Sequence, residues 1–215
     1  MQIETSQGPV VIEVRKDTKR VGIKLSGGAD SAVLTYLLAK YKTEERPDIE
    51  FMPITNVCKQ KPYNQIHADK VIGFIENRFD FKFREHMVIK NIEEEDFGKF
   101  HDHNVNMLYD AKLIDEHFIA ITSFPPDGAM DMTGTHYIEG LDRTRNIKPT
   151  KEGRSNRPLY NLDKVGIAEL YKKFDLLDDL FPLTRSCEAH THDFSHHCGT
   201  CWWCRERQWA FGRLD

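Results

Sequence analysis

A six-residue segment near the N-terminus combines residue types that bind phosphate. Ser26-Gly27-Gly28-Ala29-Asp30-Ser31 follows a strand-like stretch and precedes a helical pattern. Glycines allow a sharp turn and a close approach to a ligand, and the amides that open a helix favour negative charge. Ser26 and Ser31 add hydroxyl donors, and Asp30 is placed either to cap the helix or to hold Mg²⁺.

The segment predicts a nucleotide-phosphate loop of a particular kind. It is not a Walker A loop, because it lacks the Gly-Lys-Ser/Thr ending, and it is not a dinucleotide fingerprint, because the third glycine is missing. A plain strand-turn-helix connection is the alternative. We expect Asp30 and Ser31 to act in catalysis and the whole segment to bind the phosphates: Ser26, Gly27, Gly28, Ala29, Asp30 and Ser31.

Four of the five cysteines gather near the C-terminus, at Cys187, Cys198, Cys201 and Cys204. Two-residue gaps between thiols suit tetrahedral Zn²⁺, and four thiolates close its coordination shell, which is typical of a structural site. A disulfide, unliganded thiols and an iron–sulfur cluster remain alternatives. Four histidines lie between the thiols and could replace one, although each is expected to be solvated: His190, His192, His196 and His197.

The elements that must position these residues alternate along the chain. Strands are predicted at 9–14, 20–25, 49–57, 83–90 and 118–124, and helices at 30–41, 63–79, 104–117 and 163–180. This alternation favours an α/β fold, a doubly wound, mostly parallel sheet of about five strands with a C-terminal zinc-binding helical knot. Residues 125–161 are expected to form a long functional loop region. We divide the chain into an ATP-binding domain, 1–160, and a helical and zinc-binding segment, 161–215.

Composition narrows the classes of function. The chain has 215 residues, 40% of them hydrophobic, and a net charge of −4. An acidic chain has no global field that attracts nucleic acid, so no direct nucleic-acid partner is expected. No stretch approaches the roughly 20 apolar residues of a membrane span, and the N-terminus lacks a signal-peptide pattern. We expect a cytoplasmic protein that acts on a small molecule.

Further polar and aromatic residues are candidates of lower specificity. Lys24, on the strand that enters the loop, is expected to be solvated, whereas Lys59 and Lys61 follow the next strand, either in a solvated loop or near a nucleotide. Cys58 is expected to be a small buried residue. A basic group either clamps phosphate or a carboxylate or simply covers the surface: Arg143, Arg145, Arg154 and Arg157. An aromatic group beside Arg205 and Arg207 is expected to form a small core, with base stacking as the alternative: Trp202, Trp203, Trp209 and Phe211.

The loop resembles the PP-loop of the ATP pyrophosphatases, whose members include GMP synthetase, NAD synthetase and tRNA-thiolating enzymes. The C-terminal tail resembles that of the 7-cyano-7-deazaguanine synthases. The matching residues are Ser186-Cys187, Cys198-Gly199-Thr200-Cys201-Trp202-Trp203-Cys204-Arg205 and Ala210-Phe211, preceded by the segment from Pro158 through Lys164 to Leu170. The two ends therefore follow the order of that family.

The resemblance implies an ATP-dependent ligase with Mg²⁺ and Zn²⁺. A carboxylate attacks the α-phosphate of ATP, pyrophosphate leaves, and ammonia displaces AMP to give an amide, which a second ATP converts to a nitrile. The substrate implied is a deazapurine-like carboxylate, and a homodimer is a possible assembly. Its contacts are expected from the loop region: Phe124, Asp127, Asp131, His136, Tyr137, Asp142 and Arg143. The alternatives are sulfur transfer, as in tRNA thiolation or adenylyl-sulfate reduction, and a nucleotide-sensing module without turnover.

Overall fold

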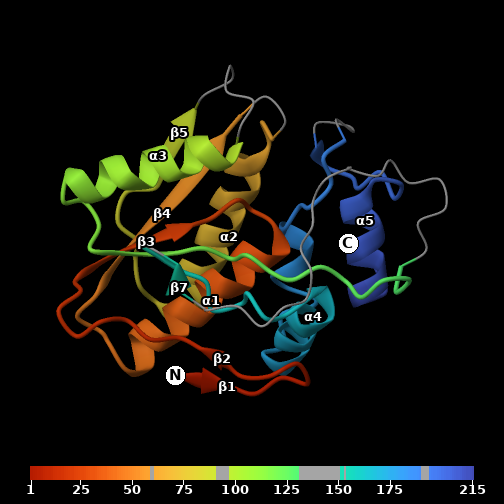
Figure 1. Cartoon of the computed structure of the whole chain (residues 1–215), viewed down its shortest axis with the longest axis horizontal. Coiled ribbons are helices and arrows are strands. Elements are labelled where there is room, and N and C mark those ends of the chain that lie inside the picture. Colours follow the sequence, from red (N-terminus) through yellow and green to blue (C-terminus); the bar gives the residue numbers. More distant parts are fainter. Residues whose placement is uncertain (59–60, 91–96, 131–150, 153, 190–193) are drawn as a thin grey trace.

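The main sheet lies at the centre of the fold. The computed structural model describes residues 1–58, 61–90, 97–130, 151–152, 154–189 and 194–215. The main sheet has the strand order β5-β4-β3-β6-β8-β7 (Figure 1), and all neighbours are parallel except β7 and β8. Its strands are β3 (Arg20–Lys24), β4 (Glu50–Val57), β5 (Met87–Lys90), β6 (Glu116–Phe118), β7 (Lys151–Glu152) and β8 (Ser155–Asn156). The predicted fold class, a mostly parallel sheet of about five strands, is therefore confirmed.

Helices complete the fold and are distributed along the whole chain. A separate antiparallel pair, β1 (Gln2–Ile3) and β2 (Val10–Val11), precedes the sheet. The α-helices are α1 (Ala29–Glu44), α2 (Asn64–Phe79), α3 (Phe97–Asp110), α4 (Lys164–Lys173) and α5 (Trp202–Phe211), with a 3₁₀ turn, η1, at Phe181–Leu183. None of the helices in the described ranges is long and apolar enough to span a membrane.

Helices cover both faces of the sheet because successive strand residues point to opposite sides. Val21 and Ile23 belong to the main apolar cluster, which also holds residues of α1, α2 and α4. Ile54 belongs to a second cluster with Val105 and Leu108 of α3. The main cluster contains residues from both predicted parts of the chain, and the division at residue 160 stays a prediction. In Figure 1, α4 and α5 lie side by side next to the start of α1.

The middle of the chain differs most from the sequence prediction. The helix predicted at 104–117 ends at Asp110, and the strand predicted at 118–124 lies instead at Glu116–Phe118, as β6, so that the two share only Phe118. Lys112 takes a left-handed conformation with φ 55, and Leu113 donates to the carbonyl of Leu108, which is a Schellman ending. Glycine usually marks such an ending, so a lysine at this position gave no sequence signal.

Other predicted elements also differ from the structure. The stretch 9–14 contributes only β2, in the small sheet, and not a strand of the main sheet. The helix predicted at 163–180 ends at Lys173, shortly before Asp175, which has φ 57. The region 125–161, expected to be a loop, contains the short strands β7 and β8. These strands have two residues each, too few for a periodic pattern to reveal them.

The left-handed ending of α3 leads to a stability prediction. Lys112→Gly is expected to raise the free energy of unfolding by about 0.5–1 kcal/mol, because glycine adopts this conformation without the steric cost of a Cβ. Lys70→Gly, the same change at an exposed position inside α2, is expected to lower it by about 0.8 kcal/mol. Urea unfolding of the two variants measures both changes. Destabilisation by Lys112→Gly would contradict the assigned ending.

Candidate functional site

The segment 26–31 forms a tight loop between β3 and α1, with its two hydroxyl groups in contact. The Oγ of Ser31 accepts from the amide of Ser26 at 3.2 Å and donates to the carbonyl of Gly28 at 3.0 Å. The hydroxyls of Ser26 and Ser31 lie 3.1 Å apart. Gly28 is the N-cap of α1 and has no side chain to occupy the first amides of the helix. The loop thus presents hydroxyls and helix amides beyond the carboxyl end of a central parallel strand, where such folds bind ligands.

Gly27 is required by both conformation and space. Its φ is +75, and a Cβ at this position would lie 2.5 Å from the Cβ of His67 and 2.9 Å from the amide of Ala68. His67 is itself held through its Nδ1, 2.9 Å from the carbonyl of Leu183. The loop therefore packs directly on the start of α2, and only glycine fits.

Asp30 binds a buried lysine and does not cap α1. The Nζ of Lys164 lies 2.7 and 2.6 Å from the two carboxylate oxygens of Asp30, and 3.3 Å from Glu206. Burial alone would lower the pKa of Lys164, but the two carboxylates outweigh it and raise that pKa. The capping role considered for Asp30 is therefore wrong, because the N-cap of α1 has no side-chain hydrogen bond.

Lys164 is a site residue that the sequence did not identify as one. It is the first residue of α4, where the Asp163 side chain accepts hydrogen bonds from Val165 and Gly166. This cap fixes the helix start and so directs Lys164 to the loop. The available signal was an Asp-Lys pair at the start of a predicted helix, but its partner lies more than 130 positions away in the sequence.

A cavity of about 410 Å³ opens beside the loop. This volume lies within the usual range for small-molecule sites. The cationic side chains on its wall are Lys24, Lys61, Lys164 and Arg185. Its other walls come from the loop itself, the start of α2, the chain after β6, and Trp203. The arrangement brings four positive groups around the predicted phosphate loop.

Lys24 and Lys61 face this cavity. Burial, together with the nearby charge of Lys61, lowers the pKa of Lys24 to about 7. The expectation that Lys24 is solvated is wrong, because its side chain belongs to the cavity wall and is half-buried. Lys61 is also half-buried and forms an ion pair with Glu188 at 2.9 Å, so it is not a solvated loop residue. Lys59 lies outside the described residues.

Several buried polar side chains lie together near Lys24, on the face of the sheet that α3 covers. His101 and His117 have ring centroids 5.2 Å apart, and they are 3% and 0% exposed. The amide of Asn56 is 3.3 Å from Nδ1 of His101. Burial, then the charge of Lys24, lowers the pKa of both rings, and that of His117 falls to about 3. The rings are therefore neutral at pH 7, and nothing in their sequence spacing indicated this group.

The four clustered cysteines converge in space. One Sγ from each of Cys187, Cys198, Cys201 and Cys204 lies within 4.8 Å of all the others. The sulfurs of Cys198 and Cys204 are 3.9 Å apart, too far for a disulfide. Backbone amides point at them: Cys198 donates to Cys187 at 3.4 Å, and Cys201 donates to Cys198 at 3.3 Å. The group can hold a metal ion, as the sequence predicted.

The thiols are already polarised by their surroundings. A hydrogen bond from Cys204 lowers the pKa of Cys201 to about 5, whereas the same contact and burial raise that of Cys204. Burial would raise the pKa of Cys198, but hydrogen bonds from Thr200 outweigh it and lower that pKa. Amide and hydroxyl donors of this kind favour thiolates, the form that binds metal.

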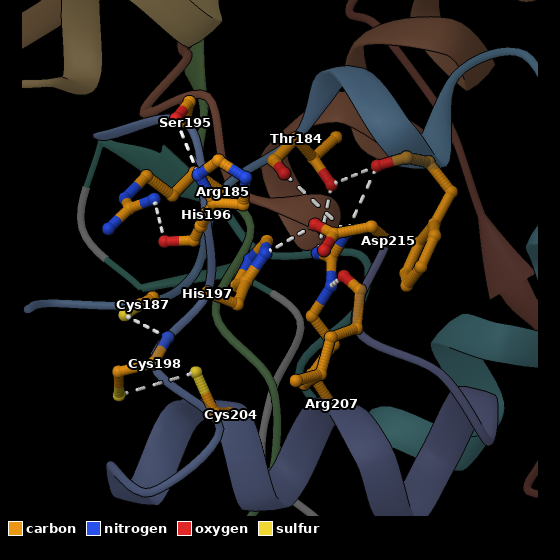
Figure 2. Close-up of polar contacts among 12 residues, drawn as sticks. Thr184, Arg185, Cys187, Ser195, His196, His197, Cys198, Cys204, Arg207 and Asp215 are labelled. Atoms are coloured by element: carbon orange, nitrogen blue, oxygen red, sulfur yellow. Dashed lines mark hydrogen bonds and ion pairs between the residues drawn. The ribbon is translucent and has the colours of Figure 1, made fainter. Parts of the chain in front are cut away.

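The remaining cysteine and histidine candidates differ in how far they are exposed to solvent. Cys58 is buried, as predicted. His196 is exposed as expected, but the side chain of His197 is only 3% exposed and binds Asp215 at 2.6 Å. His197 was expected to be solvated; the pairing with Asp215 could not be read from sequence. Figure 2 shows His197 directed to Asp215, with Cys187, Cys198 and Cys204 grouped separately.

The aromatic and basic candidates lie partly in the core, partly at the cavity and partly on the surface. Phe211 packs on Tyr171 and Phe181 in the core, whereas Trp203 lines the cavity. Arg207 is 1% exposed and stacks on Phe181. Arg154 lies on the surface over Tyr109, and Arg157 lies near Tyr160.

Of the predicted substrate contacts, Phe124 packs against Trp202 at 5.4 Å and Asp127 is exposed. The remaining predicted substrate contacts lie outside the described residues: Asp131, His136, Tyr137, Asp142 and Arg143. Arg145 of the basic group and the histidines at 190 and 192 also lie outside them.

The packing of Gly27 gives a prediction with a matched control. Gly27→Ala combines left-handed strain of about 1–2 kcal/mol with an overlap on α2 that typically costs about 1–3 kcal/mol more. Gly128→Ala has the same kind of strain, with φ +73, but its Cβ meets nothing within 4 Å. Denaturant unfolding should therefore show a clearly larger loss for Gly27→Ala. Equal losses would mean that the loop does not pack on α2 as described.

Comparisons with known proteins agree with this geometry. The family model for the queuosine biosynthesis protein QueC matches residues 126–215, which include Lys164 and the four clustered cysteines. No curated protein matches the chain. The fold is similar to that of the U34-tRNA thiolase NcsA from Methanococcus maripaludis, solved with its [4Fe-4S] cluster. The TM-score is 0.51, with 17% identity over 94% of this chain and 73% of that one.

At that identity the thiolase shows only a shared fold. The QueC match concerns the sequence itself and lies in the part that carries the cysteines. The Ser-Gly-Gly-Ala-Asp-Ser loop, the parallel sheet that presents it and the C-terminal match over residues 126–215 together make the chain similar to the PP-loop superfamily, and within it to QueC.

Proposed function

We propose that this protein binds ATP at the loop, cleaves it between the α- and β-phosphates, and transfers AMP to a carboxylate substrate. One observation carries the proposal: the hydroxyls and helix amides of the loop face a cavity ringed by Lys24, Lys61, Lys164 and Arg185. A triphosphate is the kind of ligand that satisfies such a concentration of donors and positive charge. The loop type and the QueC match support α,β-cleavage over transfer of the terminal phosphate.

The chemistry assigns a role to each group around the cavity. A carboxylate oxygen attacks the α-phosphorus, the bond to the β-phosphate bridge oxygen breaks, and pyrophosphate leaves. Negative charge then grows on the departing pyrophosphate, where the hydroxyls of Ser26 and Ser31 and the α1 amides stabilise it. Lys164 supplies a fixed positive charge close to these donors. Mg²⁺ would neutralise phosphate charge when bound, and Asp30 is the carboxylate of the loop that would hold it.

For the second half-reaction we propose the chemistry that the resemblance to the 7-cyano-7-deazaguanine synthases implies. Ammonia attacks the acyl carbon of the adenylate, AMP leaves, and an amide forms; a second activation and loss of water would give a nitrile. We infer a deazapurine-like carboxylate as the substrate, and ammonia as the nitrogen donor. Trp203 and Phe124 offer apolar surface at and near the cavity for a planar heterocycle.

We assign the four cysteines to Zn²⁺. Zn–S bonds of about 2.3 Å place the sulfurs of a tetrahedron about 3.8 Å apart, close to the 3.9 Å between Cys198 and Cys204. A four-iron cluster puts a separate iron under each thiolate and spreads the sulfurs farther apart. Bound zinc would supply a closed structural cross-link between the residue 187 segment and α5.

Sulfur transfer is the second candidate function. The low pKa of Cys201 would suit a nucleophilic thiol, and a thiolase with an iron–sulfur cluster shares this fold. The compact arrangement of all four thiols favours the metal role, because a sulfur carrier needs at least one thiol outside the coordination shell. A nucleotide sensor without turnover would bind ATP and release no AMP.

The first functional prediction concerns the nucleotide products. With Mg²⁺, ATP, ammonium and 7-carboxy-7-deazaguanine, chromatography is expected to show AMP and pyrophosphate, and more of both than with aspartate or citrulline. Asp30→Asn is expected to reduce AMP formation by at least about 100-fold, because the neutral amide would no longer hold the Mg²⁺ that stabilises the charge of the transition state. Asp17→Asn, at a side chain 85% exposed, is the control and should leave the rate unchanged.

Different outcomes of this experiment would exclude different parts of the proposal. ADP and orthophosphate as products would exclude adenylation. AMP release that no deazapurine stimulates would keep the ATP chemistry and remove the substrate assignment.

The metal assignment predicts one zinc per chain by elemental analysis, with no visible absorption from iron–sulfur charge transfer. Cys201→Ser is expected to lower stability by several kcal/mol, because structural zinc binding is coupled to folding. Cys58→Ser removes the one cysteine outside the cluster and should leave the zinc content unchanged. A metal-free protein with an unaltered melting temperature would refute the assignment, and iron with sulfide would favour the sulfur-transfer candidate.

A further inference from the structure

The segment that ends at Cys187 connects the thiol cluster to the phosphate loop. The backbone amide of Arg185 donates to the carbonyl of Gly27 at 2.9 Å. Gly27 is the loop residue whose left-handed conformation has no room for a side chain. Cys187 follows only two residues later. The position of this short segment therefore bears on both sites.

The side chain of Arg185 organises the chain between the first two thiols. Its guanidinium is almost fully buried and donates to three backbone carbonyls, those of Ala189 at 2.7 Å, Phe194 at 2.8 Å and His196 at 2.7 Å. All three carbonyls lie between Cys187 and Cys198 in sequence. Figure 2 shows the bond to His196 beside Cys187 and Cys198. The loop that carries the thiols thus determines where this guanidinium sits.

A second path runs in parallel through α5. Glu206 lies two residues after Cys204 and pairs with Lys164, which holds Asp30 of the loop. Arg207 donates to Thr184 Oγ1 at 2.9 Å and to the carbonyl of Phe181 at 3.0 Å, which fixes α5 against the segment preceding Arg185. The cluster is therefore joined to the phosphate loop from both of its sequence sides.

We propose that nucleotide binding at the loop and metal binding at the four thiols are thermodynamically linked, and that Arg185 is the positioning residue that links them. The inference rests on the proposed nucleotide and metal sites. Metal bound by the four thiols would hold Cys187 and Cys198 together, and so would keep the three carbonyls in position to accept hydrogen bonds from the Arg185 guanidinium. A buried guanidinium that loses these acceptors must move, and its backbone amide then no longer supports Gly27.

Thermodynamic linkage between the two sites predicts equal changes in the two affinities. If metal raises nucleotide affinity by some factor, nucleotide must raise metal affinity by the same factor. The probe is α,β-methylene-ATP with Mg²⁺, which binds but resists α,β-cleavage. Calorimetry gives its Kd in zinc-loaded and zinc-depleted protein, and competition with a zinc-selective chelator gives the zinc Kd with and without the probe. We expect about a tenfold change in both, within the usual range for coupled sites.

Variants locate the linkage. Arg185→Leu is expected to bind one zinc and to bind the probe more weakly, with most of the linkage lost and only the part carried by Glu206 and Lys164 left. Arg185→Lys keeps the charge but cannot reach three carbonyls, and should retain only part of the factor. Arg213→Leu is the matched control: this arginine of the same tail contacts Asp178 and the carbonyl of Leu177, not the phosphate loop.

The outcomes are distinguishable. If the probe binds no form of the protein, the proposed function fails. If probe and zinc both bind but the wild-type factor is one, or if Arg185→Leu keeps the wild-type factor, the inference is wrong. If zinc depletion unfolds the chain, zinc binding and nucleotide binding are coupled simply because both need the folded protein. That coupling would persist in Arg185→Leu, whereas the coupling carried by Arg185 would disappear.

Discussion

The ion pair between Lys164 and Asp30 is the contact on which the geometry of the site depends. A lysine with 5% exposure is costly to bury, and the carboxylates of Asp30 and Glu206 on either side offset that cost. Removing one partner of a buried pair typically costs about 3–5 kcal/mol, because the remaining charge stays in a poorly solvated place. The pair therefore constrains α1, α4 and α5 together, and these are the elements that bear the phosphate loop and one of the clustered thiols.

This constraint explains why the two ends of the chain make one site. The loop at 26–31 has almost no side-chain volume of its own, so its shape comes from what surrounds it. His67 and Ala68 occupy the space beside Gly27, Arg185 binds its carbonyl, and Lys164 fixes Asp30. A sheet with parallel strands then presents this assembly at the carboxyl edge, where the cavity opens.

The features that could be predicted from the sequence are those set by neighbouring residues. The Ser-Gly-Gly-Ala-Asp-Ser turn, the spacing of Cys198, Cys201 and Cys204, and the alternation of strands and helices all act within a few positions. The features that could not be predicted depend on distant contacts. Lys164 pairs with Asp30 although 134 positions separate them in sequence, and the pKa of Lys24 is lowered by burial and by the charge of Lys61, which lies in another part of the sequence. The end of α3 was missed for a different reason, since Lys112 occupies a position that normally calls for glycine.

The positive charge around the cavity is the physical basis of the proposal that the protein binds and cleaves ATP. Lys24, Lys61, Lys164 and Arg185 gather on the cavity wall, Lys61 and Lys164 already paired with carboxylates of the protein, and the loop adds hydrogen-bond donors for a bound anion. If the anion is the pyrophosphate part of ATP and the acceptor is a carboxylate, the adenylation step is reversible on the enzyme. The most direct measurement is exchange of labelled pyrophosphate into ATP, with ammonium omitted so that the adenylate accumulates. The account predicts that label enters ATP only when the carboxylate substrate is present and that Asp30→Asn abolishes the exchange. ATP that gains no label while orthophosphate is released from its γ-position would contradict it.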